Sequence, residues 1–89
     1  MPVSPDRLTV YSRPGCIDCD VVYEVLARWS VPHIRINILD NAVAQTAMLE
    51  ANGGVESVPT IVFHGDGTVL VEPTAEAFEL ALKESGIIY

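Results

Sequence analysis

The stretch LTVYSRPGCIDCDVV, residues 8–22, joins an expected strand to an expected helix and carries both cysteines of the chain. Residues 8–11 are short and β-prone, and the SRPG that follows is typical of a loop. From about residue 17 to residue 30, apolar side chains recur at helical spacing. These side chains are Val21, Val22, Val25, Leu26 and Trp29, and Trp29 on this stripe is expected to pack in the core. The stretch therefore predicts a strand, a turn and a helix that begins at the cysteines.

The next segment predicts a second strand and a second helix. Residues 34–38 alternate isoleucine with polar residues, which is the period-two pattern of a strand. Asp40 is expected to be the N-cap of a helix that reaches Ala51, because the NGG that follows it is a helix stop. The order up to this point is β-α-β-α.

The last third of the chain predicts a hairpin and a final helix. The runs TIVF and TVLV, residues 60–63 and 68–71, flank the turn sequence HGDG. Pro73 and Thr74 then introduce a helix over residues 75–85, which Gly86 ends, leaving IIY as a tail.

These elements fit one domain over residues 1–89. A strand, helix and strand in succession imply a right-handed βαβ unit, and the hairpin extends the same sheet. We expect an α/β fold of order βαβ-α-ββα, with a four-stranded mixed sheet and three flanking helices.

The composition excludes several classes of function. Hydrophobic residues make up 49% of the chain and the mean hydropathy is +0.32, which excludes a disordered chain. The chain has 12 acidic and 5 basic side chains and a net charge of −7, so nucleic acid and anionic membranes are not expected partners. No signal peptide or membrane-spanning stretch is evident, so the expected compartment is the cytoplasm. The protein is also expected to be a monomer.

The two cysteines have three candidate roles. A disulfide between Cys16 and Cys19 closes so short a loop that it stabilises the fold by roughly 2 kcal/mol at most, so a structural clip is a poor reading. A zinc site needs about four ligands, and His33 and His64 lie at spacings unlike the usual histidine pair. A redox pair fits better, because backbone N–H groups at a helix N-terminus stabilise a thiolate.

In the redox reading, Cys16 is the nucleophile and Cys19, one helical turn later, is the resolving thiol. Arg13 should lower the pKa of Cys16, whereas Asp18 and Asp20 should raise it by charge repulsion. We therefore expect Asp18 to moderate the acidity of Cys16.

The segment YSRPGCIDC and the segment Ser57-Val58-Pro59-Thr60 together resemble the glutaredoxin branch of the thioredoxin fold over essentially the whole chain. The resemblance implies a cis Pro59 beside the disulfide and a Val58 backbone that pairs with an extended substrate. Val58, Pro59 and Thr74 are expected to line the substrate groove, and Arg13 is expected to assist thiolate formation or to bind a carboxylate of the substrate.

The chain departs from many glutaredoxins at two places. Ile17 and Asp18 stand where a proline and an aromatic residue are common, and VEPTAEA stands where a glutathione-binding segment is common. Thr74 in that segment is expected to cap the last helix and to bind an anion or a polar group. The pattern is more similar to mycoredoxins and related small bacterial glutaredoxins. Tyr11, at the end of the first strand, is a further candidate for lining the substrate.

The expected function is that of a dithiol-disulfide oxidoreductase that uses Cys16-Ile17-Asp18-Cys19 to reduce protein disulfides or mixed disulfides. It needs no permanent cofactor, and a low-molecular-weight thiol such as glutathione or mycothiol is the co-substrate. One alternative is an electron donor to targets like ribonucleotide reductase, itself reduced by thioredoxin reductase. Another is a non-enzymatic module that senses redox state or shares a metal or iron-sulfur cluster through Cys16.

Overall fold

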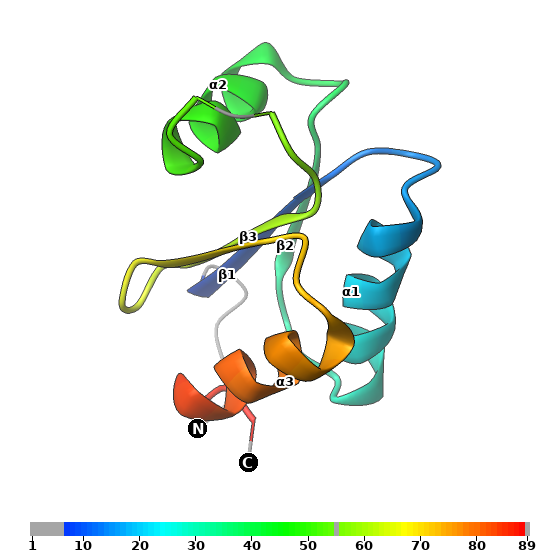
Figure 1. Cartoon of the computed structure of the whole chain (residues 1–89), viewed down its shortest axis with the longest axis vertical. Coiled ribbons are helices and arrows are strands. Elements are labelled where there is room, and N and C mark those ends of the chain that lie inside the picture. Colours follow the sequence, from blue (N-terminus) through cyan, green and yellow to red (C-terminus); the bar gives the residue numbers. More distant parts are fainter. Residues whose placement is uncertain (1–6, 55, 89) are drawn as a thin grey trace.

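The computed structural model describes residues 7–54 and 56–88, and it has the expected order of strands and helices (Figure 1). The α/β class and the order βαβ-α-ββα are confirmed. The elements are β1 (Leu8–Ser12), α1 (Ile17–Arg28), β2 (Ile34–Asn37), α2 (Ala42–Ala51), β3 (Thr60–Phe63), β4 (Thr68–Val71) and α3 (Ala75–Glu84).

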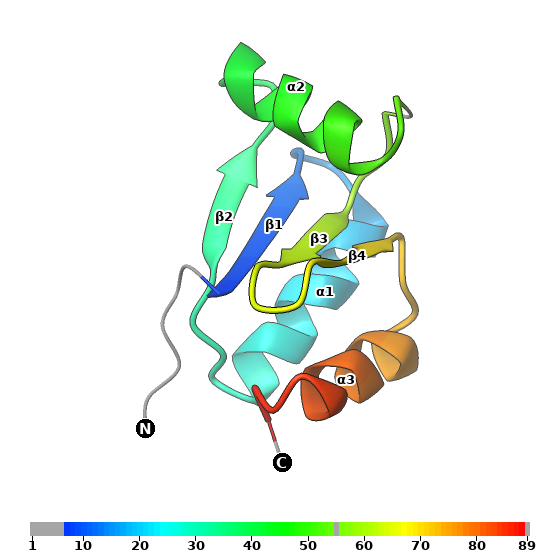
Figure 2. The same cartoon turned by 90° about the vertical axis from the view of Figure 1, so that its left-hand side faces the viewer.

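The strands form one mixed sheet in the order β2-β1-β3-β4. β1 runs parallel to β2 and antiparallel to β3, and β3 and β4 form the predicted hairpin. Helices α1 and α3 pack together on one side of this sheet, and α2 lies on the other side (Figures 1 and 2). The central strand β1 therefore delivers the loop before α1 to the end of the sheet where α2 also lies.

Alternation along β1 divides the buried residues into two clusters. Leu8 and Val10 face the larger cluster, which contains the buried side chains of α1 and α3, and Phe63 meets Phe78 there edge to face at 6.4 Å. Tyr11 faces the smaller cluster under α2. The smaller cluster consists of Tyr11, Cys19, Ile38, Ala44, Met48 and Val58. Cys19 is thus part of the core.

The end of α1 corrects the expectation that Trp29 is buried. The apolar stripe of this helix ends at Leu26, which is 1% exposed, whereas Trp29 is 40% exposed. Trp29 is the C-cap, with φ −99° and ψ 4°, so the chain has already left the helical path at this position. Its side chain therefore does not continue the buried stripe.

The beginning of α2 corrects the expected N-cap. Asn41, and not Asp40, caps this helix, because its Oδ1 accepts from the N–H groups of Val43 at 2.9 Å and Ala44 at 3.1 Å. Asp40 belongs to the preceding turn, in which its N–H donates to the carbonyl of Asn37. The NGG stop is confirmed, with Asn52 as the C-cap.

The end of α3 corrects the expected tail. Gly86 adopts a φ of +78°, which glycine tolerates, and the N–H groups of Ile87 and Ile88 then both donate to the carbonyl of Leu82. Ile87 and Ile88 are 8% and 7% exposed and belong to the larger core cluster. These residues close the core instead of trailing from it.

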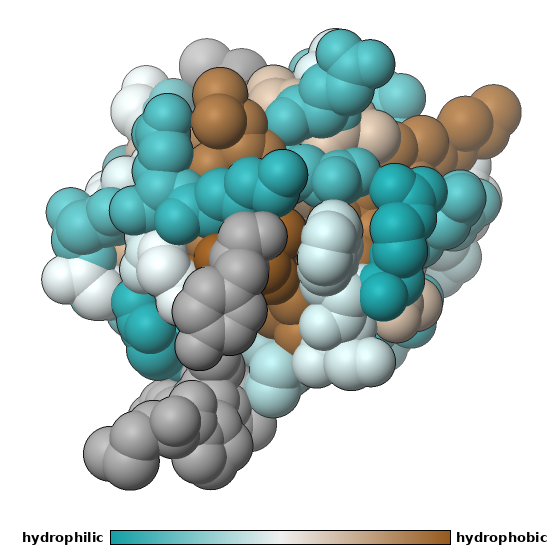
Figure 3. All heavy atoms as spheres, turned by 90° about the horizontal axis from the view of Figure 1, so that it is seen from below, coloured by the Kyte–Doolittle hydropathy of each residue, from teal (hydrophilic) through white to brown (hydrophobic). Residues whose placement is uncertain are grey.

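Polar side chains dominate the face that Figure 3 shows, with patches of apolar surface between them. Within the described part of the chain, none of the helices has the length and apolar character required to cross a membrane.

Candidate active site

The cysteines lie at a tight junction between β1 and α1. Ser12 ends the strand, and Gly15 turns the chain with a φ of +75°, a conformation that residues with a Cβ adopt rarely. Cys16 follows in an extended conformation as the N-cap of α1. The loop therefore places the first cysteine at the positive end of the α1 dipole.

Cys16 and Cys19 form a disulfide with a Cα–Cα distance of 5.2 Å. Their accessibilities differ: Cys16 is half-buried, whereas Cys19 is 2% exposed. A large substrate can reach the sulfur of Cys16 more readily than that of Cys19.

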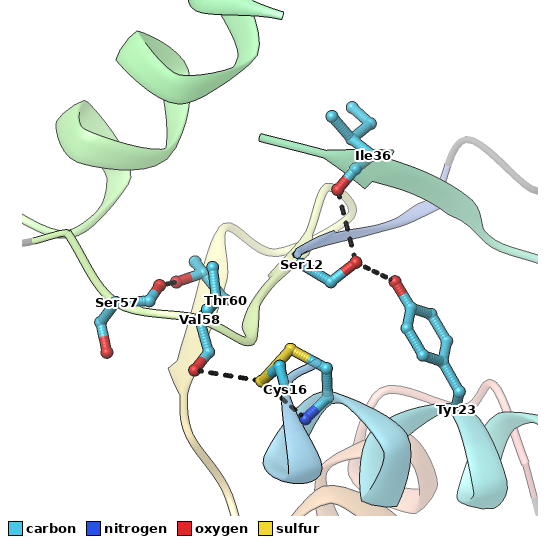
Figure 4. Close-up of a disulfide and its surroundings, with 8 residues drawn as sticks. Ser12, Cys16, Tyr23, Ile36, Ser57, Val58 and Thr60 are labelled. Carbon is cyan, nitrogen blue, oxygen red and sulfur yellow. Dashed lines mark hydrogen bonds between the residues drawn. A yellow bond between two sulfur atoms is a disulfide. The ribbon is translucent and has the colours of Figure 1, made fainter. Parts of the chain in front are cut away.

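Two backbone groups contact the sulfur of Cys16. The N–H of Cys19 donates to Sγ at 3.1 Å, and the carbonyl of Val58 lies 3.9 Å from Sγ (Figure 4). An N–H aimed at sulfur favours negative charge on that atom. The site therefore has a group suited to a thiolate and, opposite it, the backbone of a neighbouring segment.

That neighbouring segment, Ser57 to Thr60, is held by a short hydrogen-bond network. The Val58–Pro59 peptide bond is cis, as the resemblance implies. Thr60 is fully buried, and its hydroxyl donates to the carbonyl of Ser57 at 2.6 Å (Figure 4). The same hydroxyl accepts from Nδ2 of Asn52 at 2.8 Å. The C-cap residue of α2 thereby supports the segment that faces Cys16.

The remaining candidate residues occupy different surroundings. Arg13 and Asp18 are exposed on either side of Cys16 in the chain, and no described carboxylate forms an ion pair with Arg13. Thr74 is the N-cap of α3, and its hydroxyl accepts from the N–H of Ala77 at 3.1 Å. Tyr11 is only 9% exposed and packs beside Cys19 under α2, so little of it is open to a substrate.

The two histidines have structural partners. A ring nitrogen of His33 lies 2.9 Å from the carbonyl of Val31, and His64 lies 2.8 Å from the hydroxyl of Thr9. Among residues 7–54 and 56–88, no three His, Cys, Asp or Glu side chains are grouped as a metal site requires.

The sequence did not single out a groove that opens beside Cys19. Its volume is about 530 Å³, and Ser12, Tyr23 and Arg35 line it together with Arg13. These residues come from β1, α1 and β2, so only the fold brings them together. Arg35 is exposed on β2, as an ordinary surface residue of a strand is. The sequence therefore gave no sign that it lines a groove.

Comparisons with known proteins agree with this geometry. Residues 8–68 match the family model for glutaredoxin. A search of curated proteins gave no match.

Several solved structures are similar to this chain in fold. The thioredoxin-like protein BC3987 is 27% identical with a TM-score of 0.71, and the match covers 82% of this chain and 96% of that chain. The protein XcR50 from X. campestris is 26% identical with a TM-score of 0.62, over 86% of this chain and 96% of that chain. Wheat glutaredoxin is 19% identical with a TM-score of 0.61, over 90% and 73% of the two chains, which shows the common fold.

Proposed function

The chain belongs to the glutaredoxin family, and from this premise we propose that Cys16 attacks the disulfides of proteins or of small mixed disulfides and that Cys19 resolves the intermediate. Thiol-disulfide oxidoreductase activity itself follows from the family and the Cys16–Cys19 pair. The proposal assigns the two roles, and the observation that carries it is the unequal exposure of the two cysteines.

The reaction begins with the Cys16 thiolate. It attacks one sulfur of the substrate disulfide, forms a mixed disulfide and expels the other sulfur as a thiolate. Cys19 then loses its proton and attacks the sulfur of Cys16, which releases the second substrate thiolate and leaves the Cys16–Cys19 disulfide. Two electrons pass from the two cysteines to the substrate disulfide. A reductant must then supply two electrons to reduce the Cys16–Cys19 disulfide.

The residues around Cys16 have separate roles in this proposal. The N–H of Cys19 and the α1 dipole stabilise the thiolate, while Arg13 assists them or binds a substrate carboxylate. The Val58 backbone, with Pro59 behind it, pairs with an extended substrate, because its carbonyl faces Cys16. Thr74, the N-cap of α3, is proposed to bind an anion or a polar group of the substrate with the N-terminus of that helix.

Asp18 is proposed to raise the pKa of Cys16. The test is thiolate absorbance against pH in Asp18→Asn, with Glu24→Gln, on the exposed side of α1, as a matched control. The pKa of Cys16 should fall in Asp18→Asn and stay closer to wild type in the control. An unchanged or higher pKa in Asp18→Asn contradicts this role.

The reductant is proposed to be a low-molecular-weight thiol. The departure at VEPTAEA from the common glutathione-binding segment supports a thiol other than glutathione, such as mycothiol. One mixed-disulfide substrate offered with glutathione, with mycothiol, or with thioredoxin reductase and NADPH distinguishes the systems. Turnover only with thioredoxin reductase would overturn the small-thiol proposal.

Trapping tests the assignment of the two cysteines. Cys19→Ser should accumulate a mixed disulfide on Cys16, identified by mass spectrometry of proteolytic peptides, because the buried resolving thiol is missing. Cys16→Ser should accumulate none and lose turnover. Accumulation on Cys19 in the Cys16→Ser protein would reverse the roles.

A further inference from the structure

Glu72, in the loop between β4 and α3, has an unusual backbone conformation. Its φ is +48°, in the left-handed region that glycine adopts most easily, and Ser30 is the one other non-glycine residue of the described chain in that region. Because glycine makes such a turn with less strain, the turn gains nothing from the glutamate side chain. The carboxylate is therefore a candidate for a role outside the turn.

The backbone of Glu72 is tied to the segment that faces Cys16. β4 pairs antiparallel with β3, and the N–H of Glu72 continues this pairing by donating to the carbonyl of Pro59 at 2.9 Å. The residue before Pro59, Val58, has its carbonyl 3.9 Å from Sγ of Cys16. Figures 1 and 2 both show the loop after β4 passing close to the N-terminal turn of α1. Glu72 is therefore fixed beside the place where a disulfide substrate reacts.

The side chain of Glu72 is exposed and has no ion-pair partner. Two other glutamates pair with Arg28, whereas no Lys, Arg or His of the described chain lies within ion-pair distance of the Glu72 carboxylate. The helix that follows does not depend on this carboxylate, because the hydroxyl of Thr74 caps α3. Its charge is thus left to act on molecules that approach Cys16.

The charges nearest to Cys16 along the chain favour neither sign of ligand. Arg13 precedes this cysteine and Asp18 follows it, and both side chains are exposed. The loop after β4 adds the charge of Glu72, and residues 65–82 contain no Lys, Arg or His. A carboxylate attracts an ammonium or guanidinium group of an approaching disulfide and repels an acidic group, and the Cys16 thiolate adds to both effects.

We infer that Glu72 determines specificity at Cys16: on the side of the site next to Pro59, it attracts disulfides that carry a cationic group and repels acidic ones. This role rests on the proposed function, in which the disulfide pairs with the Val58 backbone and so brings its neighbouring groups beside Glu72. The cation belongs either to an amine of a small disulfide or to a lysine or arginine beside a cysteine of a protein substrate.

The charge of Glu72 sharpens two parts of the proposed function. Thr74 lies two residues further along the chain, so a neutral polar group of the substrate fits there better than an anion. Glutathione has a negative net charge, so Glu72 disfavours it as the reducing thiol and favours a neutral or cationic one.

Charged thiol reagents test the preference without any turnover. In Cys19→Ser protein, Cys16 is the one remaining thiol. Its thiolate attacks the sulfenyl sulfur of a methanethiosulfonate, forms a mixed disulfide and releases methanesulfinate. The rates with a cationic trimethylammonium-ethyl reagent and with an anionic sulfonato-ethyl reagent of similar size are compared. A change in the reactivity of Cys16 itself affects both rates equally and cancels in their ratio.

Removal of the carboxylate should change this ratio of cationic to anionic rates. Glu72→Gln should lower the cationic rate about twofold and raise the anionic rate about twofold, as expected for one exposed charge, so the ratio should fall about fourfold. Glu72→Lys reverses the charge and should lower the ratio about fifteenfold. In about 1 M salt, where the Debye length is about 3 Å, the ratios of all the proteins should nearly converge.

Glu84→Gln is the matched control, because Glu84 is exposed at the opposite end of α3. The helix has 10 residues, so this end lies roughly 15 Å from the end beside Glu72, beyond the Debye length of about 8 Å at physiological salt. The control should leave the ratio nearly unchanged. An unchanged ratio in Glu72→Gln, or an equal fall in Glu84→Gln, would overturn the inference.

Single-turnover reduction then tests the consequence for substrates. Reduced protein is mixed with cystamine, bis(hydroxyethyl) disulfide or dithiodipropionate, which are cationic, neutral and acidic disulfides of similar size. The rate of Glu72→Gln relative to wild type should be about one half for cystamine, about one for the neutral disulfide and about two for the acidic one. Equal relative rates for all three would overturn the specificity role. If the wild-type protein reduces none of them, the proposed function fails, and the thiol reagents still decide the charge preference at Cys16.

A peptide pair identifies the source of the cation. A disulfide-linked peptide with lysine beside its cysteine is compared with the glutamine version. A preference for lysine that Glu72→Gln abolishes supports a protein substrate, and a preference seen only among the small disulfides supports a small-molecule source. A charge preference in neither set overturns the inference.

Discussion

Thr60→Val should destabilise the segment that faces Cys16 without creating a cavity. Thr60 is fully buried, and valine keeps its branched shape while replacing the hydroxyl by a methyl group. The substitution removes two hydrogen bonds, one donated to the carbonyl of Ser57 at 2.6 Å and one accepted from Asn52 at 2.8 Å. The loss therefore falls on hydrogen bonding and not on packing.

The expected cost can be worked from these two groups. A polar group that loses its partner and stays away from water costs about 1–3 kcal/mol. The Ser57 carbonyl and the Asn52 amide are both partly buried, so the low part of this range applies to each, and the free energy of unfolding should fall by about 2–3 kcal/mol. Asn52 already has one unsatisfied polar atom, because its Oδ1 is buried and has no hydrogen-bond partner among the described residues.

The assay is urea unfolding of the oxidised protein, followed by kcat/KM for a disulfide substrate. Thr46→Val is the matched control: the Thr46 hydroxyl donates to the carbonyl of Ala42 at 3.0 Å on the exposed side of α2. That change should alter the free energy of unfolding by no more than about 0.5 kcal/mol. Turnover should fall only in Thr60→Val, because the Ser57 bond positions the neighbouring Val58 carbonyl.

A double variant separates the network from other effects. Asn52→Ala added to Thr60→Val removes the amide that the first change left without an acceptor, so the combined loss should be smaller than the sum by about 1 kcal/mol. Strict additivity, or a loss in Thr60→Val no larger than in Thr46→Val, would refute the reasoning.

Other changes probe the ends of α3 and the hairpin turn. Ile88→Ala should lower the free energy of unfolding by about 2–3 kcal/mol in urea melts, because Ile88 is 7% exposed. Leu80→Ala, at a position of α3 that is 57% exposed, should change it by no more than about 0.5 kcal/mol; similar losses would contradict the burial of the C-terminal segment. Thr74→Ala should cost about 1 kcal/mol in the same assay, because the N–H of Ala77 loses its capping acceptor, and a cost near zero would refute the cap. The backbone N–H of Thr68 donates to Oδ1 of Asp66 and lowers the pKa of this carboxyl below its ordinary value, so NMR should show it titrating at a lower pH than an unperturbed aspartate. A lowered pKa stabilises the fold above the unfolded pKa and loses this effect as pH falls through the folded pKa, so Asp66→Asn should flatten the acid side of the stability curve; an unchanged slope contradicts it.

The fold was largely readable from the sequence because its signals are local. The hairpin at residues 60–71 is confirmed to the residue, since two apolar runs flank a turn whose residues tolerate special backbone angles. Thr74 and the stop at Asn52 are likewise confirmed as caps, which depend on a few neighbouring residues. Local hydrogen-bond chemistry places such caps to within about one residue, since the N-cap of α2 is Asn41 instead of Asp40.

The errors about burial share a different cause. Trp29 continues the helical spacing of apolar residues, but α1 ends at Arg28. Periodicity alone does not predict the residue at which a helix ends. The burial of Ile87 and Ile88 depends on the chain turning back after Gly86 onto a core assembled from distant strands. Spacing patterns describe an element, whereas burial at its ends is decided by what the rest of the fold places beside it.

The groove beside Cys19 is the strongest case of this limit. Arg13 comes from the loop before α1 and Arg35 from β2, and the guanidinium of Arg35 lies over the ring of Tyr23, a residue of α1. Each of these side chains, taken in its own segment, has the pattern of an ordinary surface or helix residue. Only the parallel pairing of β1 with β2 and the packing of α1 beside them bring the three to one groove, and no spacing along the chain encodes that meeting.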